Sequence, residues 1–500
     1  MGRVVRVEAA AVTVAAADGF ATTVGLEIHV ELSTRSKMFC GCEVAFGGEP
    51  NTRTCPVCLG LPGSLPVVNG RAVEHTLRIA LALGCDIAAR SLFHRKNYFY
   101  PDIPKNYQIS QYDLPFGVGG ALEVPDGDEV VRVGIARVHL EEDTGKSLHV
   151  GGTGRIADSE YSLEDFNRAG TPLVEIVTEP DITSPGQARA FVSELRALLE
   201  SLGVSDVRME EGSLRVDANV SVRRTGEAEH GTKVEVKNLN SIRSVGRALE
   251  HEVARQRSAL EAGGQLIQET RHFDEKAGTT SPLRSKEYAF DYRYFPEPDL
   301  VPFEPARADV DRLRASLPES PARRRERFAR ELGLGAHDIA VLTASARVAD
   351  WFERAARAYG GDAKRVANWI TADLFGLLNE AAAELHETRF SPEDLAALVK
   401  LVDGGTISGK QAKAVLQEMF ATGKAPDAIA AERGLQQISD AHELGAVVDQ
   451  VVADNPDVAA KVRGGQTSAI GFLVGQVMKR TRGRANPALV NGLLRDKLAP

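Results

Sequence analysis

Three segments in the first half of the chain alternate strictly between apolar and polar residues. They are residues 25–32 (GLEIHVEL), 214–223 (LRVDANVSVR) and 232–238 (TKVEVKN). A period of two predicts half-buried strands, which usually pair in antiparallel sheets. The polar faces carry Glu, His, Asp and Asn rather than Lys and Thr. This composition favours a functional face, although a merely solvated sheet face would show the same alternation.

Helical patterns lie between these strands. Ser184 and Pro185 precede an apolar stripe that stops at Gly203, which is the order of cap, first-turn proline and C-terminal glycine expected of a helix. Residues 71–83 form a second predicted helix, and we expect Cys85 to be a small buried residue of it. Residues 96–113 are rich in Tyr, Pro and Asn and predict a long, functional loop.

The pattern changes twice along the chain. Strand patterns vanish after about residue 305, and helical stretches rich in Ala, Leu, Arg and Glu replace them. A second change comes at residues 423–426. The sequence therefore predicts an α+β protein, with a largely antiparallel sheet domain followed by an all-α domain and a small α tail domain. The expected boundaries are 1–21 for a loose extension, then 22–310, 311–425 and 426–500.

Composition narrows the class of protein. The chain has 500 residues, 43% apolar and 26% charged, which is ordinary for a globular protein. Its 60 basic and 69 acidic residues give a net charge of −9, which excludes a wholly basic nucleic-acid coat but not a local basic patch. No segment reaches the roughly 20 uncharged apolar residues of a membrane helix, and the first residues lack the order of a secretory signal. We expect a cytoplasmic protein.

Four of the five cysteines lie within nineteen residues, as two close pairs. Such pairs fit a tetrahedral Zn²⁺ site, because each pair supplies one edge of the tetrahedron. Four free cysteines and an iron–sulfur cluster are the alternatives. The clustering also favours a reducing compartment. The predicted zinc ligands are Cys40, Cys42, Cys55 and Cys58.

Acidic residues form three further groups. The segment RVHLEEDTGKS (137–147) ends like half of a P-loop but lacks its leading glycine, so its acids suit a divalent cation better. An acidic solvated turn is the alternative. Carboxylates from several strands could together hold a magnesium nucleotide. The candidates are His139, Glu141, Glu142 and Asp143, then Glu210, Glu211 and Asp217, then Glu27 and His29. No G-x-S-x-G elbow or Gly-Ser-Ser run indicates an amide-hydrolysing nucleophile.

Seven motifs appear in an order that resembles one family, over about residues 22–500. They are VGLEIHVEL, CxC…CPVCLGLPG, RKNYFYPDIPKNYQISQYD, HLEEDTGKS, DFNRAGTPLVEIVTEPD, EVKNLNSIRS and DYRYFPEPDL. They resemble the GatB family, the B subunits of tRNA-dependent aspartyl/glutamyl-tRNA amidotransferases. The resemblance implies a heterotrimer of three different proteins. The two partners are an amidase, which releases ammonia from glutamine, and a small third subunit.

Members of that family bind mischarged Glu-tRNA(Gln) or Asp-tRNA(Asn). They use ATP and Mg²⁺ to phosphorylate the side-chain carboxylate, and ammonia arriving through an internal channel displaces the phosphate. The resemblance implies an N-terminal cradle domain distantly like glutamine synthetases, and a tail that contacts tRNA. The tail of this chain is locally basic, with no acid between residues 461 and 487. Its cations are Lys461, Arg463, Lys479, Arg480, Arg482 and Arg484.

The resemblance also implies site residues. The magnesium site corresponds to Glu27, His29, Glu141 and Glu142, and Glu142 could also take a proton from ammonium at the channel mouth. Lys96 is expected to contact phosphate or the channel, unless it is an ordinary surface lysine. Glu211 and Asp217 are added as cofactor-binding residues.

Two other classes of function compete with this one. A nucleic-acid-binding module with a zinc knuckle would explain the cysteines and the aromatic, basic loop, but its carboxylates would repel phosphate without a metal. A free-standing ligase that acts on a small amino acid would leave the long helical C-terminus without a use.

Overall fold

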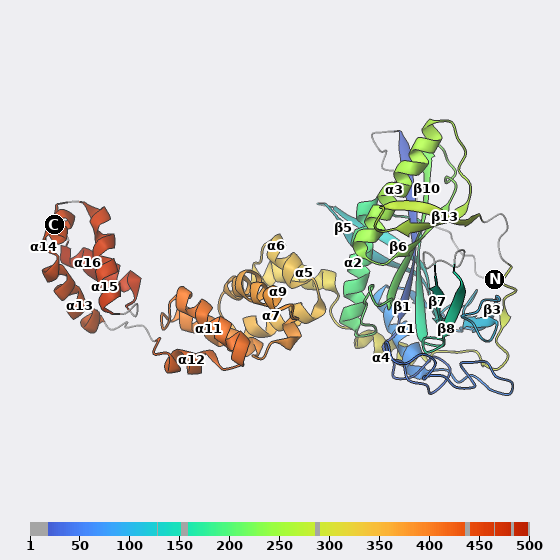
Figure 1. The fold of residues 1–500 in the computed structure, drawn as a ribbon, viewed down its shortest axis with the longest axis horizontal. Coiled ribbons are helices and arrows are strands. Elements are labelled where there is room, and N and C mark those ends of the chain that lie inside the picture. The colour runs from blue at the N-terminus through green and yellow to red at the C-terminus, as the bar shows by residue number, and fades with distance from the viewer. Residues whose placement is uncertain are drawn as a thin grey trace. The chain divides into compact units, whose positions relative to one another are not determined.

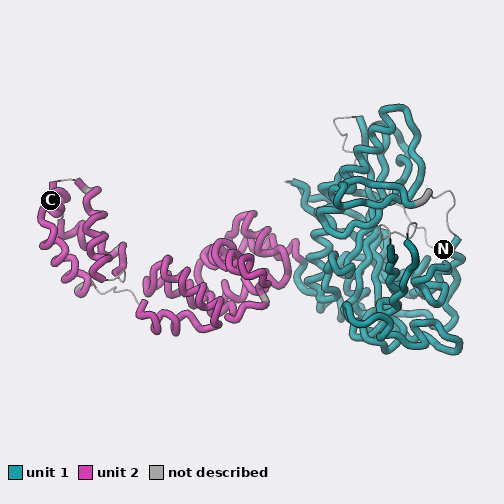
Figure 2. The backbone as a smooth tube through the Cα atoms, viewed as in Figure 1, with its two compact units in different colours: residues 1–320 teal, residues 321–500 magenta. Residues whose placement is uncertain are grey.

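The computed structural model describes residues 19–127, 129–151, 159–285, 291–435, 441–464, 466–481 and 485–498. Most of the expected N-terminal extension, together with Arg482 and Arg484 of the basic tail, lies outside these ranges. The chain divides into two compact units, residues 1–320 and 321–500 (Figure 2). No helix of the described residues is long and apolar enough to cross a membrane.

A large sheet forms the centre of the first unit, in the order β13-β12-β11-β10-β1-β9-β6-β5-β2. Neighbouring strands pair antiparallel, except for β11 and β12, which are parallel. The strands of this sheet are β1 (Phe20–Glu31), β2 (Asp86–Ile87), β5 (Gly117–Asp126), β6 (Glu129–Glu142), β9 (Pro172–Thr178), β10 (Leu214–Arg224), β11 (Val234–Leu239), β12 (Glu269–Asp274) and β13 (Thr279–Ser285). The three alternating segments of the sequence are β1, β10 and β11, which confirms a mostly antiparallel sheet.

Helices cover one face of this sheet (Figure 1). They are α1 (Gly70–Ala82), α2 (Pro185–Leu202) and α3 (Ile242–Glu261). Helix α2 has the predicted ends: the hydroxyl of Ser184 accepts a hydrogen bond from the amide of Gln187, and Gly203 is left-handed with φ 65°. Beneath these helices, the alternate side chains Val24, Leu26, Ile28 and Val30 of β1 are fully buried. The other side chains of β1 therefore face away from the helical layer.

Smaller elements lie on that second face (Figure 1). A small sheet has the order β14-β3-β4, and a separate hairpin joins β7 and β8. Their bounds are β3 (His94–Asn97), β4 (Tyr107–Ser110), β7 (Lys146–Val150), β8 (Tyr161–Asp165) and β14 (Phe295–Pro296). The expected long loop at 96–113 is thus partly wrong, since its two ends pair as strands β3 and β4. Cys85 also differs from expectation: it is buried, but in the turn between α1 and β2.

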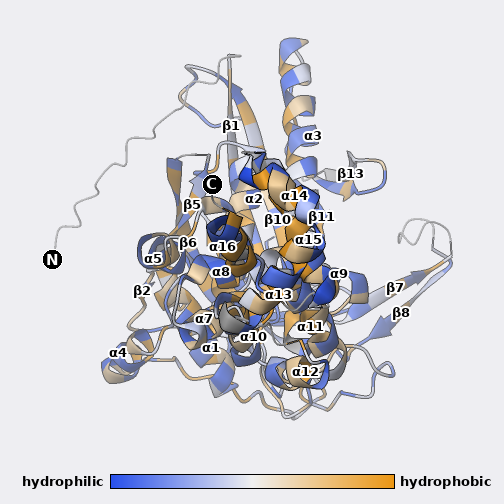
Figure 3. Ribbon diagram, turned by 90° about the vertical axis from the view of Figure 1, so that its left-hand side faces the viewer, coloured by the Kyte–Doolittle hydropathy of each residue, from blue (hydrophilic) through white to orange (hydrophobic). Residues whose placement is uncertain are grey.

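The second unit is helical in its described residues, as expected. One hydrophobic core lies under the helices up to α12, and a separate core lies under α13 to α16. Many of these helices show both hydrophilic and hydrophobic segments (Figure 3). After α4 (Arg307–Ala315) of the first unit, the helices are α5 (Pro321–Leu332), α6 (Ala336–Leu342), α7 (Ala346–Tyr359), α8 (Ala363–Asn368), α9 (Phe375–Ala381), α10 (Pro392–Asp403), α11 (Gly409–Thr422), α12 (Pro426–Glu432), α13 (Ala441–Asp454), α14 (Pro456–Arg463), α15 (Ile470–Arg480) and α16 (Pro487–Leu498).

Short helical turns of other types complete this unit. A π-helical turn, Trp369–Leu374, joins α8 directly to α9. Two 3₁₀ turns span Leu385–Glu387 and Thr467–Ala469.

Candidate active site

The face of the sheet opposite the helices brings two histidines and two carboxylates together. Strand register places Glu175 of β9 opposite both His29 of β1 and His139 of β6. Nε2 of His29 lies 3.4 Å from Oε2 of Glu175, and Nε2 of His139 lies 3.5 Å from the same oxygen. Glu141 follows two residues after His139 on the same face, 3.6 Å from its Nε2. The alternation that buries the apolar side chains therefore also assembles this polar group.

Three of these residues could hold a cation together. Ligand atoms of His29, Glu141 and Glu175 all lie within 4.8 Å of one another. Two buried carboxylates this close repel each other unless a positive charge compensates them. In addition, Nδ1 of His139 is buried without a hydrogen-bond partner. The two carboxylates of this donor set fit a hard divalent cation such as Mg²⁺, whereas His139 directs its other nitrogen, Nε2, toward them.

The pKa shifts show how strongly these groups interact. Burial raises the pKa of Glu175, but the charge of His139 together with the hydrogen bond and charge of His29 outweigh it, so the net shift is downward. For His29, burial lowers the pKa, yet the hydrogen bond and charge of Glu175 raise it overall. The two effects together favour a carboxylate beside a protonated imidazole. A metal at this place would have to displace that proton, because only neutral imidazole binds metal.

A cavity of about 410 Å³ opens beside this group. His29 and Glu141 line it, together with the cations Lys96, Arg215 and Lys237. Nζ of Lys96 lies 5.0 Å from the ring centroid of Tyr292 and 6.0 Å from that of Tyr98. Burial lowers the pKa of Lys96, but the charge of Glu141 raises it above its ordinary value. Lys96 therefore lies in the wall of this cavity, beside Glu141 and the tyrosine rings.

The other predicted acids have different surroundings. Glu27 lies outside the cation-binding group, and its Oε1 accepts a hydrogen bond of 2.9 Å from Nδ2 of Asn219. Asp217 lines the cavity and pairs with Nζ of Lys237 at 2.6 Å. Glu211 pairs with Arg208 at 2.7 Å and is absent from the cavity lining.

Glu142 lines a second cavity, of about 140 Å³. Its carboxylate pairs with Nζ of Lys105 and accepts a hydrogen bond of 2.9 Å from the amide of Ile109. Cys40 and Cys58 line the same cavity. The structure therefore does not bring Glu142 together with His29 and Glu141, although Glu141 is its neighbour in sequence.

The cysteine cluster borders this second cavity. One sulfur atom from each of Cys40, Cys42, Cys55 and Cys58 lies within 4.8 Å of the others. The Sγ atoms of Cys55 and Cys58 are 3.9 Å apart, close to the roughly 3.8 Å edge of a tetrahedron with Zn–S bonds of about 2.3 Å. The hydrogen bond of Cys40 and the charge of Lys37 lower the pKa of Cys58 to about 5. Hydrogen bonding to Cys58 raises the pKa of Cys40, and burial raises that of Cys42, so among these three the charge is concentrated on the Cys58 sulfur.

Comparison with known proteins decides the family. A family model described as the GatB/GatE catalytic domain matches residues 22–311, and a second, described as the GatB domain, matches residues 350–498. The chain belongs to the GatB family. Its relatives include the B subunit of the aspartyl/glutamyl-tRNA(Asn/Gln) amidotransferase of Moorella thermoacetica, 55% identical over 96% of this chain and 100% of the relative. The corresponding proteins of Carboxydothermus hydrogenoformans and Anaeromyxobacter dehalogenans are 53% and 52% identical over 96% of this chain and 99% of each relative.

In this GatB-family chain, sequence reasoning missed Glu175, the third member of the group that could hold a cation with His29 and Glu141. Glu175 is a single acid inside the apolar strand PLVEIVT. A buried strand that tolerates one carboxylate is a signal of function, because an unpaired buried charge is costly. However, only the register of β9 with β1 and β6 shows which residues that carboxylate meets.

Proposed function

We propose that this GatB-family chain is the transamidation subunit of a glutamine-dependent aspartyl/glutamyl-tRNA amidotransferase, an ATP-dependent ligase. It converts misacylated Glu-tRNA(Gln) or Asp-tRNA(Asn) into Gln-tRNA(Gln) or Asn-tRNA(Asn). The similarity to the relatives' full length supports this assignment. The partners are the amidase and the small third subunit of the heterotrimer, together with the mischarged tRNA. The cytoplasmic location expected from the cysteines stays a prediction.

The chemistry needs an activated carboxylate. Ammonia cannot displace oxide from a carboxylate, whereas it can displace phosphate from an acyl phosphate. Forming that acyl phosphate from ATP requires cations around the transferred group. The observation that carries our assignment is the cavity of about 410 Å³. Two members of the possible cation-binding group, His29 and Glu141, line it, and so do three basic side chains.

We assign roles to residues in and around this cavity. His29, Glu141 and Glu175 hold Mg²⁺, which supplies charge neutralisation to the phosphates of ATP. Lys96 contacts either the phosphate or the carboxylate under attack. Glu27 and Asp217 position side chains near this group. Glu27 accepts a hydrogen bond from Asn219, and Asp217 accepts one from Lys237. Glu211 remains a proposed cofactor contact at the edge of the site.

Glu142 is proposed to act on the amine rather than on the nucleotide. It lines a different cavity, where the cation that it contacts is Lys105. A carboxylate there can take the proton that ammonium must lose before it attacks. This assignment replaces a direct role of Glu142 as a magnesium ligand.

The remaining parts receive structural or tRNA-binding roles. Cys40, Cys42, Cys55 and Cys58 bind one Zn²⁺, which stabilises the knuckle at residues 40–58. Residues 22–310 form a cradle distantly like glutamine synthetases, residues 311–425 an all-α domain, and residues 426–500 a tail that contacts tRNA.

One experiment tests the function as a whole. The assembled heterotrimer is incubated with ATP, Mg²⁺, glutamine and either Glu-tRNA(Gln) or Asp-tRNA(Asn), and ADP and the amino acid released from the tRNA are measured. We expect ADP formation that depends on mischarged tRNA, with Gln or Asn as the released amino acid. ADP formation with free glutamate instead would indicate a small-molecule ligase, and no ADP formation would indicate a binding module.

A further inference from the structure

The motif EVKNLNSIRS has so far entered only through the contact of its lysine with Asp217, yet this lysine itself lies in the active-site cavity. Lys237 belongs to β11, and residues 237–240 line the cavity together with His29 and Glu141. Its side chain is 38% exposed, so it can reach a ligand. Nζ of Lys237 lies 2.6 Å from Oδ2 of Asp217 and 3.2 Å from Oε1 of Glu235.

The ammonium group of Lys237 is charged and retains donor capacity. Burial lowers the pKa of Lys237, but Asp217 and Glu235 outweigh this and raise it above its ordinary value. An ammonium group has three N–H donors, and its two carboxylate partners among the described residues account for two. One donor is left for a ligand in the cavity.

The chain around Lys237 is held in place. Asn238 has the left-handed φ of 71°, a conformation that costs energy for a residue other than glycine and persists where its surroundings impose it. Nδ2 of Asn238 donates to the carbonyl of Phe273 at 3.0 Å, and Nδ2 of Asn240 donates to Oδ1 of Asn238 at 3.0 Å. These bonds tie the cavity wall to strand β12.

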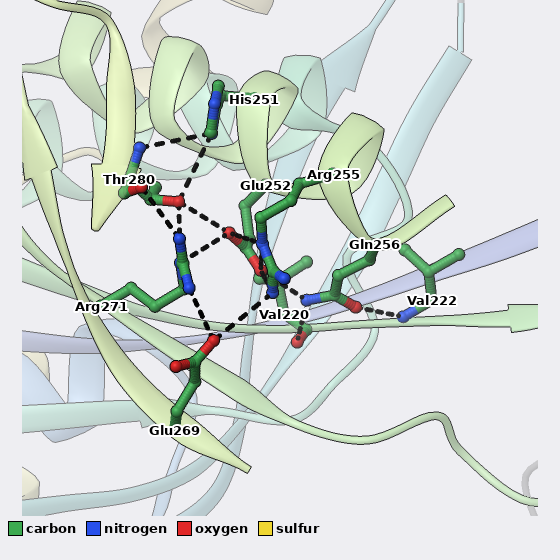
Figure 4. Close-up of polar contacts among 9 residues, drawn as sticks. All are labelled: Val220, Val222, His251, Glu252, Arg255, Gln256, Glu269, Arg271 and Thr280. Carbon is green, nitrogen blue, oxygen red and sulfur yellow. Dashed lines mark hydrogen bonds and ion pairs between the residues drawn. The ribbon is translucent and has the colours of Figure 1, made fainter. Parts of the chain in front are cut away.

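Strand β12 is itself anchored by a buried ionic network (Figure 4). Arg271 of β12 pairs with Glu269 at 2.6 Å and with the fully buried Glu252 of α3 at 3.4 Å. Gln256 of α3 accepts a hydrogen bond of 3.0 Å from the amide of Val222 of β10. Helix α3 is thereby joined to strands on both sides of β11, so the position of Lys237 is well defined.

We propose that Lys237 is a further phosphate-binding residue of the phosphoryl-transfer step. This inference rests on the proposed function. In that step an oxygen of the substrate carboxylate forms a bond to the γ-phosphorus of ATP, and the bond from this phosphorus to the bridging oxygen breaks, which gives an acyl phosphate and ADP. Lys237 donates a hydrogen bond to a phosphate oxygen, keeps its own protons and stabilises the negative charge that develops.

Two substitutions at this position separate charge from packing. Lys237→Gln keeps a donor for Asp217 but removes the charge, and Lys237→Arg keeps the charge. Lys233→Met is the matched control, because Lys233 is an exposed lysine just before the same strand. The readouts are KM for ATP and kcat of glutamine-dependent amidation by the heterotrimer, and the rise in Tm on adding ADP with Mg²⁺.

We expect Lys237→Gln to lower kcat/KM for ATP by about 10²-fold and to reduce the ADP-dependent rise in Tm. Lys237→Arg should recover part of both, and Lys233→Met should behave as the wild type. A lower Tm without nucleotide, but with an unchanged KM, kcat and ADP-dependent shift, would show a purely structural ion pair and overturn the proposal. If the wild-type heterotrimer itself forms no ADP with mischarged tRNA, the proposed function fails instead.

Discussion

Glu141 and Glu142 are adjacent in sequence but line different cavities. Glu141 lies beside His139 in the cavity of about 410 Å³, and its Oε2 accepts a hydrogen bond of 2.8 Å from Ser110. Glu142 lies in the cavity of about 140 Å³ with Lys105. Successive side chains of a strand point in opposite directions, so one acidic dipeptide at the end of β6 can serve two separate steps of a reaction.

This separation predicts different losses for two matched variants. Glu141→Gln should reduce tRNA-dependent ADP formation by about 10²-fold or more, because a cation ligand is lost. Glu142→Gln should reduce amidation by about 10²–10⁴-fold while leaving tRNA binding nearly intact, because the base is lost. ADP and amidated tRNA are quantified in the same reactions. The exposed Glu123 of β5 supplies the control, Glu123→Gln. Equal effects of both substitutions on ADP formation would contradict separate roles.

The zinc assignment predicts one equivalent of Zn²⁺ per chain. A structural zinc site contributes on the order of 10 kcal/mol to its local fold, so Cys55→Ser should lose the metal and unfold residues 40–58. Elemental analysis of protein purified without chelator measures the metal, and protease sensitivity of the knuckle measures its unfolding. Cys85→Ser is the control, since Cys85 lies in the main core away from the cluster. Less than half an equivalent of zinc in the wild type would rule out the site.

The ionic network of α3 predicts a pH-dependent contribution to stability (Figure 4). Burial raises the pKa of Glu252, but Arg255, Gln256 and Thr280 lower it overall. Glu252→Gln should therefore destabilise the protein by about 3 kcal/mol at pH 7. This is the low end of the cost of breaking a buried ion pair, because Arg271 still pairs with Glu269 after the substitution. The control is Glu250→Gln, also on α3, which removes an exposed ion pair with Arg189 of α2 and should cost at most about 1 kcal/mol.

The sign of the pH effect follows from the direction of the shift. A carboxyl group with a lowered folded pKa contributes its full stability above its unfolded pKa of about 4.3 and loses it as pH falls through the folded value. The difference in Tm between wild type and Glu252→Gln should thus narrow below about pH 4. A difference that stays constant from pH 7 to pH 3.5 would argue against an ionic contribution.

The basic tail predicts salt-dependent tRNA binding. Lys461, Arg463 and Lys479 lie in α14 and α15 over a separate core, whereas Arg480 pairs with Asp454 at 2.6 Å and is partly neutralised. Deleting residues 426–500 should weaken tRNA binding by about 10-fold or more and flatten its salt dependence. Binding isotherms at several salt concentrations measure both. Glutamine hydrolysis should persist, and an unchanged affinity and slope would reassign the tail to contact with another member of the heterotrimer.

The sequence predicted those parts of the fold that are encoded locally. Alternation in β1, β10 and β11 and the caps of α2 depend on nearest neighbours and on burial of one face, so they can be recognised without a structure. The strands β3 and β4 were missed because their segment is rich in Tyr, Pro and Asn. The two strands pair with each other, and β3 also pairs with β14, where Phe295 lies opposite Arg95, 200 residues earlier in the chain.

The candidate site, too, could be predicted only where local sequence carries the signal. His29 and Glu141 could be identified because each stands in a conspicuous motif. Glu175 could not be grouped with them, since its role depends on the register of β9 between β1 and β6. Conversely, Glu142 looked equivalent to Glu141 in sequence, and only the packing of Lys105 and Ile109 around it separates the two.

Glu175 therefore provides the most direct test of the central claim, that the histidine and carboxylate group holds Mg²⁺ for phosphoryl transfer. The measurement is the rate of tRNA-dependent ADP formation by the heterotrimer as Mg²⁺ is titrated, for wild type and Glu175→Gln. We expect the variant to require at least about 10-fold more Mg²⁺ and to remain about 10²-fold slower at saturation, because a ligand and its charge are lost. A wild-type Mg²⁺ dependence and rate in Glu175→Gln would contradict the account.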